Sequence, residues 1–233
     1  MIYGYRNSLL PGGVVVKRLW IGLLMSIGLG LSTQYVAAEE SRVPEVSPEL
    51  WSKFNSINKN ATKKAALLEK AKERGLFCAS CHGKDGNGTR PHIPKLAGQN
   101  PAYVLEQLEK FSDGRRSHYV MVPLAKEFTD EDKIGFAFYF SQFEMIPAGG
   151  DARLAVMGKK VFEAACIHCH GVDGRGSKGY SRLAGQMPVY VRKALQHYRD
   201  KYGDRKSVLM EQVTQSLTDD QIDALAEYIG TMK

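Results

Sequence analysis

Apolar residues recur at helical spacing along most of the chain. Residues 61 to 76 are rich in Ala, Lys, Leu and Glu, which favour helix formation. Four residues of this segment share one helical face: Ala61, Ala65, Leu68 and Ala71. Residues 152 to 165 have the same character in the second half of the chain. Because the alternating pattern of a strand is nearly absent, the sequence predicts an all-α protein.

Further helices are marked by the residues that begin them. Pro101 and Pro188 stand where the first turn of a helix tolerates proline. Two later helices begin with a threonine N-cap and a reciprocal partner three positions on: Thr129 with Asp132, and Thr218 with Gln221. We therefore predict about three main helices in each half of the chain, joined by glycine-rich loops.

The two halves are copies of one module. Three motifs occur in both halves in the same order: CxxCH at residues 78–82 and 166–170, GxDGxG at 83–88 and 171–176, and LAGQ at 96–99 and 183–186. Such a repeat indicates that one structural unit is used twice. We expect two domains, at residues 61–145 and 152–233. The linker between them, residues 146–151, has the proline and paired glycines that are typical of a connector.

The CxxCH motifs predict two covalently bound c-type haems. They contain every cysteine of the chain: Cys78, Cys81, Cys166 and Cys169. Two thiols at this spacing reach the vinyl groups of one porphyrin, and the next residue, His82 or His170, then serves as the proximal iron ligand. A four-cysteine zinc site would place its pairs about 15–20 residues apart, whereas these pairs lie 88 positions apart. A thioredoxin-like dithiol would occur once, near a βαβ pattern.

Met121 and Met210 are the predicted sixth ligands of the two irons. Each stands eight residues before the threonine that begins the last helix of its module, so the two occupy one position of the repeat. Methionine opposite histidine is usual in electron-transfer haems and raises the potential. Histidine is the competing ligand, but the other four have no repeat partner and are expected in loops or at the surface: His92, His118, His168 and His197.

Three of these features together carry a family resemblance. The paired CxxCHGxDGxG runs, the segment PKLAGQ at residues 94–99, and Met121 followed by FTDED at 128–132 resemble the two-haem class I cytochromes c of the cytochrome c4 type. The resemblance covers about residues 62 to 233. It implies two class I cytochrome c domains related by a pseudo-two-fold axis. It also implies a periplasmic carrier that passes electrons between a membrane respiratory complex and a terminal oxidase or reductase.

The second module departs from the family pattern at one position. In such domains a proline ahead of the LAGQ run supplies a backbone carbonyl to the proximal imidazole. Pro94 fits this role, but Ser181 stands there in the second module. Hydrogen bonds of this kind set the orientation and basicity of a ligand. We therefore expect His170 to be held less rigidly than His82, and the two haems to differ in potential.

Residues 1–38 have the layout of a secretory signal peptide. They contain no acidic residue, and Lys17 with Arg18 precedes an apolar run at 19–32 and small residues before Glu39. This fourteen-residue run is short for a bilayer span. We expect cleavage near Ala38 and a periplasmic protein. An uncleaved N-terminal membrane anchor is the alternative.

Residues 39–60 form an extension outside the family pattern. Ser47 and Pro48 are typical of a helix start, and the apolar residues that follow fall on one face: Leu50, Trp51, Phe54 and Ile57. We expect this short amphipathic helix to pack on the first module. Docking of a partner protein is the alternative.

The net charge does not indicate a nucleic-acid-binding protein. The chain has 32 Lys and Arg against 25 Asp and Glu, a net charge of +7. Loss of Arg6, Lys17 and Arg18 with the signal peptide would lower it to +4, and the propionates of two haems would cancel the rest. Arg192 with Lys193, and residues 199–206, form either a basic face for an acidic redox partner or an ordinary solvated face.

Two functions remain open at this point. The first is a non-enzymatic electron carrier, because an iron held by histidine and methionine has no open position for a substrate. Its donor and acceptor would be redox proteins, membrane respiratory complexes among them, with peripheral membrane association as a further option. The second is the haem subunit of a redox enzyme, such as a flavocytochrome c sulfide dehydrogenase. Identification of proteins that copurify with the native chain would distinguish the two.

Overall fold

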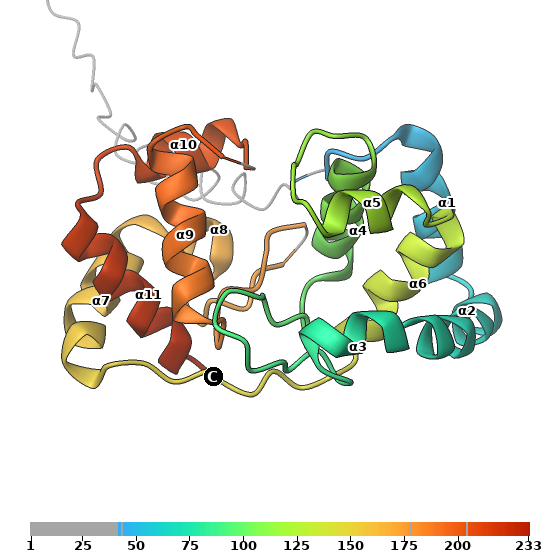
Figure 1. Ribbon diagram of the computed structural model, residues 1–233, viewed down its shortest axis with the longest axis horizontal. Helices are drawn as coiled ribbons and strands as arrows, with labels where there is room; N and C mark the ends of the chain where they lie inside the picture. Colours follow the sequence, from blue (N-terminus) through green and yellow to red (C-terminus); the bar gives the residue numbers. More distant parts are fainter. Residues whose placement is uncertain (1–41, 43, 178, 204) are drawn as a thin grey trace, which may run out of the picture. The chain divides into compact units, whose positions relative to one another are not determined.

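The computed structural model describes residues 42–233 except 43, 178 and 204, so the expected signal peptide lies outside it. Within the described residues the chain forms eleven helices and no strand, which confirms the all-α prediction (Figure 1). None of these helices combines the length and the apolar character that crossing a membrane requires. Helix α1 (Pro48–Asn58) belongs to the N-terminal extension.

Each module contains three long helices and two short ones. The first module comprises α2 (Ala61–Arg74), α3 (Leu76–His82), α4 (Pro101–Ser112), α5 (Met121–Lys126) and α6 (Asp130–Ser141). The second comprises α7 (Ala152–Ala165), α8 (Ile167–His170), α9 (Pro188–Arg199), α10 (Val208–Thr214) and α11 (Asp219–Thr231). The long helices confirm the prediction. The short helices, which begin at the CxxCH motifs and near the paired methionines, were not predicted.

The helices begin where the sequence predicts, with one difference. Pro101 and Pro188 open α4 and α9. The first helix of the first module was expected to reach Leu76, but α2 ends at Arg74 and a new helix, α3, starts after Gly75. A Cβ at Gly75 would lie 2.8 Å from the carbonyl oxygen of Ala71, so a larger residue there would force the backbone to shift.

Both predicted capping boxes form, and they begin the helix that closes each module. Asp132 N–H donates to Thr129 Oγ1 at 3.2 Å, and Thr129 N–H donates back to the Asp132 carboxylate at 3.0 Å. Gln221 N–H donates to Thr218 Oγ1 at 3.2 Å, and Thr218 N–H donates to Gln221 Oε1 at 2.9 Å. Each box satisfies two backbone donors that a helix start leaves free.

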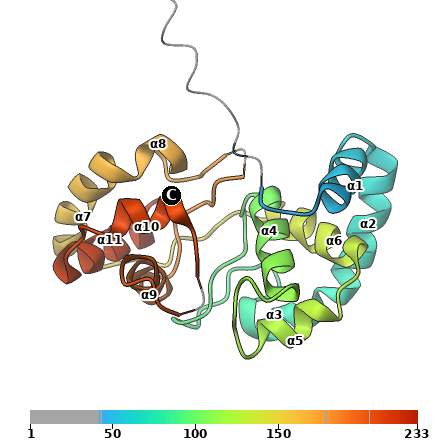
Figure 2. The same ribbon diagram turned by 90° about the horizontal axis from the view of Figure 1, so that it is seen from above.

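The first and last helices of each module pack against each other. Helix α2 lies on α6 in the first module, and α7 lies on α11 in the second (Figures 1 and 2). Helices α4 and α9 complete the two cores by packing on α6 and α11. The buried residues form one apolar cluster in each module, so each module has its own core.

Helix α1 packs on the first module, as expected. Leu50 and Phe54 are buried, and the rings of Trp51 and Phe138 stack on either side of Phe54 with centroid distances of 5.1 and 4.9 Å. Ser47, however, makes no side-chain cap bond to the helix. Its N–H and hydroxyl donate instead to the Glu109 carboxylate at 3.0 and 2.8 Å, which holds the helix start to α4.

The glutamine of each LAGQ run binds the residue that precedes the LAGQ run of the other module. The amide of Gln99 accepts from Arg182 N–H and donates to Arg182 C=O at 2.9 Å. The amide of Gln186 accepts from Lys95 N–H at 2.7 Å and donates to Lys95 C=O at 3.0 Å. Both glutamines are buried, so two side chains that water hardly reaches satisfy four backbone groups, those of the buried residue Lys95 and the partly buried residue Arg182.

Candidate haem sites

The two CxxCH histidines occupy matching positions. His82 is the last residue of α3, and His170 is the last residue of α8; both are buried. His82 Nδ1 lies 2.8 Å from Pro94 O, and His170 Nδ1 lies 2.9 Å from Ser181 O. Because a carbonyl oxygen only accepts, each Nδ1 carries the proton and each Nε2 keeps a free lone pair for a metal.

Ser181 therefore replaces Pro94 without loss of the backbone contact. The expected departure in the second module is present in the sequence, but the carbonyl that binds the imidazole is in place in both modules. The backbone N–H of Ser181 donates no hydrogen bond within the described part of the chain. The difference between the two sites is thus in the stiffness of residue 181 rather than in the presence of the acceptor.

The GxDGxG loops form hydrogen bonds to the backbone carbonyl of each motif histidine. Gly88 N–H donates to His82 O at 2.7 Å, and Gly176 N–H donates to His170 O at 2.8 Å. A Cβ at Gly88 would lie 2.8 Å from the His82 carbonyl carbon. Glycine is required for this close approach. The repeat predicted these glycines but not their role, which is to close the loop on the end of the motif helix.

Burial sets the protonation of the motif side chains. It lowers the pKa of His82 and of His170, so both imidazoles are neutral, as metal ligands must be. Burial also raises the pKa of Cys78 to about 11 and that of Cys166 to about 12. These thiols are poor thiolate ligands. Within the described residues, no three His, Cys, Asp or Glu side chains lie close enough together to hold a metal ion.

The paired methionines share their surroundings. Met121 is the first residue of α5 and packs on the core cluster of its module, as Cys78 and Leu96 do. Met210 lies in α10 and packs on the second cluster, as Cys166 and Leu183 do. The structure thus places each methionine and the first cysteine of its motif against the same core.

Two other methionines are used for packing. Met145 is 5% exposed and Met187 is 7% exposed. A Cβ added to Gly98 or to Gly185 would contact Met145, so this side chain lies between the two LAGQ segments. Met187 is the N-cap residue of α9. Neither methionine occupies a repeated position.

The remaining histidines have structural surroundings. His118, which is exposed as expected, accepts at Nδ1 from the N–H groups of Val120 and Met121 at 3.3 Å and so helps to begin α5. His197 was expected at the surface, but it is 7% exposed and packs against Gly203 and Tyr202. The prediction for His197 was wrong because the loop that follows α9 covers its ring.

Exposed apolar side chains flank both methionines. They are Val120, the N-cap residue of α5, Leu124 within α5, and Val208, Leu209 and Val213 on α10. Large apolar residues at this density are costly in water unless something covers them. A porphyrin bound in each module would supply an apolar face of the required kind. The residues present therefore fit a haem in each module.

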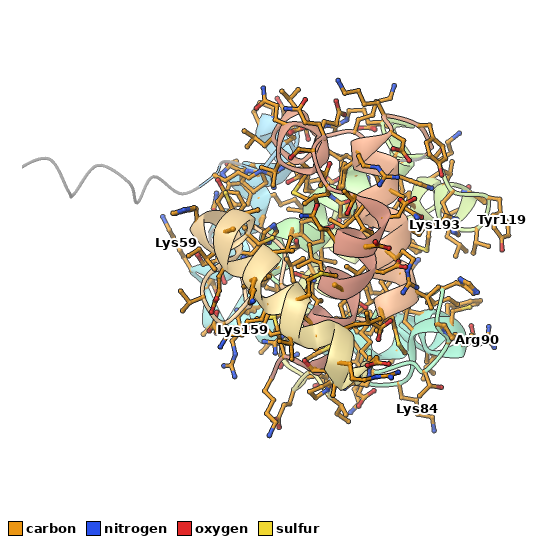
Figure 3. The ribbon with its side chains drawn as sticks, turned by 90° about the vertical axis from the view of Figure 1, so that its left-hand side faces the viewer. Lys59, Lys84, Arg90, Tyr119, Lys159 and Lys193 are labelled. Carbon is orange, nitrogen blue, oxygen red and sulfur yellow. The ribbon has the colours of Figure 1, made fainter. Side chains whose placement is uncertain are left out.

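The predicted basic face of the second module is largely neutralised. Arg192 binds Asp223 and, at 3.2 Å, Glu227. Arg199 binds Asp200 and Asp219, each at 2.7 Å. Lys193 is exposed and points outward (Figure 3). The solvated-face alternative therefore accounts for the arginines of α9.

Comparison with known proteins supports the same conclusion. The cytochrome c family model matches residues 65–134 and 155–233. Cytochrome c4 of Pseudomonas aeruginosa is 33% identical over 168 residues, which are 67% of this chain and 84% of that protein. A thiosulfate dehydrogenase electron acceptor of Stutzerimonas stutzeri is 32% identical over 183 residues, which are 70% of this chain and 82% of that protein.

A solved structure shows the same fold. The crystal structure of reduced recombinant cytochrome c4 from Pseudomonas stutzeri matches with a TM-score of 0.67 and 30% identity, and the match covers 71% of this chain and 98% of that one. Two tandem cytochrome c domains, two CxxCH motifs and these relatives together establish two covalently bound haem c groups and a role in electron transfer. The chain belongs to the cytochrome c4 family of di-haem cytochromes.

Proposed function

We propose that the chain is a periplasmic electron carrier with both irons six-coordinate. Haem 1 would be held by Cys78, Cys81, His82 and Met121, and haem 2 by Cys166, Cys169, His170 and Met210. The haem domains would be residues 61–145 and 152–233, joined by the linker 146–151. The observation that carries the proposal is the repeated arrangement of a carbonyl-bound histidine and a methionine on one core in each module.

The residues of each site have separate tasks in this proposal. The haem iron supplies the reversible one-electron chemistry. Donation from Nδ1 to the backbone carbonyl fixes the ring plane of His82 or His170 and makes Nε2 more basic. Methionine on the other side favours the reduced state and so raises the potential. If histidine and methionine side chains hold the iron from both sides, no position at the iron would be left for a substrate.

The partners of this carrier would be redox proteins. The family resemblance favours a membrane respiratory complex as donor and a terminal oxidase or reductase as acceptor. The name of the Stutzerimonas stutzeri relative favours a second candidate donor, a thiosulfate dehydrogenase. Both alternatives use the same site. Turnover of each purified donor with this chain as acceptor would distinguish them.

Export to the periplasm is part of the proposal. It is supported by the acid-free N-terminal segment with its short apolar run and by the extracytoplasmic attachment of c-type haem in bacteria. Peptide sequencing of the mature protein should find Glu39 at or near its N-terminus. Peptides that contain Trp20 in the membrane fraction would instead show an uncleaved anchor.

Substitution of the methionines tests the ligand assignment. Met121→Ala and Met210→Ala should each convert one haem to a high-spin form that binds carbon monoxide when reduced, because one axial position is opened. Met145→Ala and Met187→Ala are matched controls, since both side chains are buried elsewhere. They should lower stability by about 2–5 kcal/mol without changing either haem spectrum. An unchanged haem spectrum after removal of Met121 or Met210 would show that the assignment of that ligand is wrong.

A further inference from the structure

Arg42 of the N-terminal extension binds both modules at once. Its Nη2 donates to the carboxylate of Glu106 in α4 at 2.7 Å, and its Nη1 donates to the backbone carbonyl of Gly179 at 3.0 Å. The guanidinium also lies 5.9 Å from the centroid of the Tyr180 ring, which is within the range of a cation–π contact. One side chain thus connects a core helix of the first module to the loop at residues 179–181 of the second.

This loop is the one that holds the CxxCH histidine of the second module. Ser181 O accepts from His170 Nδ1 at 2.9 Å. The Tyr180 ring meets the His170 ring edge-on, with the centroids 6.2 Å apart. A hydrogen bond of this kind fixes the orientation and the basicity of a metal-bound imidazole. A shift of the loop would therefore move the acceptor away from the nitrogen that it binds.

The first module stiffens the corresponding loop with proline. Pro91 and Pro94 lie in the segment that leads from His82 to the carbonyl that its ring binds, and each proline fixes one backbone dihedral. The sequence between His170 and Ser181 contains no proline. The second loop therefore lacks the internal stiffness of the first.

The extension packs directly against the second loop. Gly179 has a φ of 93°, and a Cβ there would lie 2.9 Å from Arg42 O and 3.5 Å from Pro44 Cγ. Glycine is needed both for this backbone conformation and for the close approach. Gly179 and Pro44 are buried. The loop thus has the backbone as well as the guanidinium of Arg42 against it.

Glu106 gives Arg42 a firm attachment in the first module. It is 0% exposed, and Lys110 Nζ lies 2.6 Å from the same Oε1 atom that Arg42 binds. A buried carboxylate of this kind is stable only with charged partners. The equivalent position of α9 is occupied by Lys193, which is exposed. The attachment point for Arg42 is therefore a feature of the first module alone.

We propose that Arg42 is a positioning residue for haem 2: it braces the loop at 179–181 against Glu106 and so keeps the Ser181 carbonyl on His170 Nδ1. The proposal rests on the proposed ligation of haem 2 by His170. Arg42 does for the second loop what the two prolines do for the first. The extension, which lies outside the haem domains, is then part of the haem 2 site.

Arg42→Met in the full-length oxidised holoprotein tests the proposal. Glu106 keeps Lys110 as its partner in this variant, so no buried charge is left unpaired. NMR of the haem-shifted resonances measures how fast the Nδ1 proton of each proximal histidine exchanges with solvent. Exchange at His170 should become about tenfold faster, the factor expected when one charge-assisted hydrogen bond no longer holds the loop. Exchange at His82 should stay as in the wild type.

Ser181→Pro provides the rescue. Added to Arg42→Met, it stiffens the loop from within, and exchange at His170 should return close to the wild-type rate. Lys53→Met is the matched control, because it removes another positive charge of the extension, one that pairs with Glu131 of the first module. It should change the exchange of neither histidine.

Several results would overturn the proposal. They are unchanged exchange at His170 in Arg42→Met, equal acceleration at both histidines, and failure of Ser181→Pro to reverse the effect. A shift in the potential of haem 2 without faster exchange would show that Arg42 acts through its charge alone, which also contradicts a positioning role.

The wild-type spectrum separates this proposal from the proposed function. If the His170 ring proton shows no haem-induced shift in the wild type, His170 is not an iron ligand and both proposals fail. If the shift is present and Arg42→Met leaves the exchange unchanged, the ligation stands and only the role of Arg42 is wrong.

Discussion

In each module the first and last long helices approach closely at a glycine, but the glycine lies on the last helix in the first module and on the first helix in the second. In the first module, Gly135 of α6 faces Ala71 of α2, and a Cβ at Gly135 would lie 3.1 Å from the Ala71 Cβ. In the second module, Gly158 of α7 faces Ala224 of α11, and a Cβ at Gly158 would overlap the Ala224 carbonyl oxygen. Both modules therefore have the same close approach of two helices, although a different helix supplies the glycine that permits it.

The two cores also differ in whether residues outside the haem domain contribute to them. The first core has an aromatic centre, Phe136, Phe138 and Phe140, which α1 covers with Leu50 and Phe54. The second core consists mainly of Phe162 and aliphatic residues of α9 and α11, and among the described residues no extra helix covers it. The extension also reaches both modules: Arg42 donates to Glu106 at 2.7 Å and to Gly179 O at 3.0 Å. The first module thus depends on residues that precede the haem domain.

Phe54→Ala should produce the largest difference in stability between the two modules. Loss of a buried phenylalanine and of its stacking on Trp51 and Phe138 should cost about 3–5 kcal/mol of stability. The loss should appear as earlier unfolding of the first module, followed by the release of methionine from haem 1. The exposed residue Ser56 provides a control on the outer face of α1, and Ser56→Ala should be nearly neutral. Equal weakening of both haem sites by Phe54→Ala would contradict the separation of the two cores.

Alanine at the crossing glycines should have unequal effects. Gly158→Ala should destabilise the second module by about 2–3 kcal/mol, because the new methyl group meets rigid backbone of α11. Gly135→Ala should stay within about 1 kcal/mol of the wild type, since the mild contact with Ala71 is offset by the better helix propensity of alanine. Denaturant unfolding monitored at each haem measures both. A larger loss for Gly135→Ala would reverse the comparison.

Ser181→Pro should have the smallest effect. The carbonyl of residue 181 already binds His170 at 2.9 Å, so proline changes only the stiffness of the segment. We expect a small shift in the potential of haem 2 and none in haem 1, which a redox titration of both haems would measure. If the two haems shift equally, residue 181 is not a source of asymmetry between them.

The repeat made most of the fold predictable, because it identified helices by two independent copies. Pro101 with Pro188 and Thr129 with Thr218 marked helix starts that the structure has. Features that belong to a single copy were harder to predict. The break at Gly75 and the burial of His197 depend on tertiary packing, which local periodicity does not report.

The site was predictable where residue type alone determines chemistry. The CxxCH motifs specify their cofactor, whereas the burial of Arg205 among three tyrosines depends on tertiary packing. The signal was available in the sequence, since Arg116 and Arg205 have the same spacing to the paired methionines. Arginine, however, is ordinarily a surface residue, and only the burial of both guanidiniums shows that their position matters.

The reciprocal bonds of Gln99 and Gln186 have the form of an isologous interface. Each glutamine binds the backbone of the residue that the other module places opposite it, Arg182 or Lys95, and these two residues are themselves repeat partners. In symmetric oligomers such a self-complementary patch joins two identical subunits. Fusion of a single-haem homodimer into one polypeptide would produce this arrangement, and the linker would then be the segment that joins the two copies.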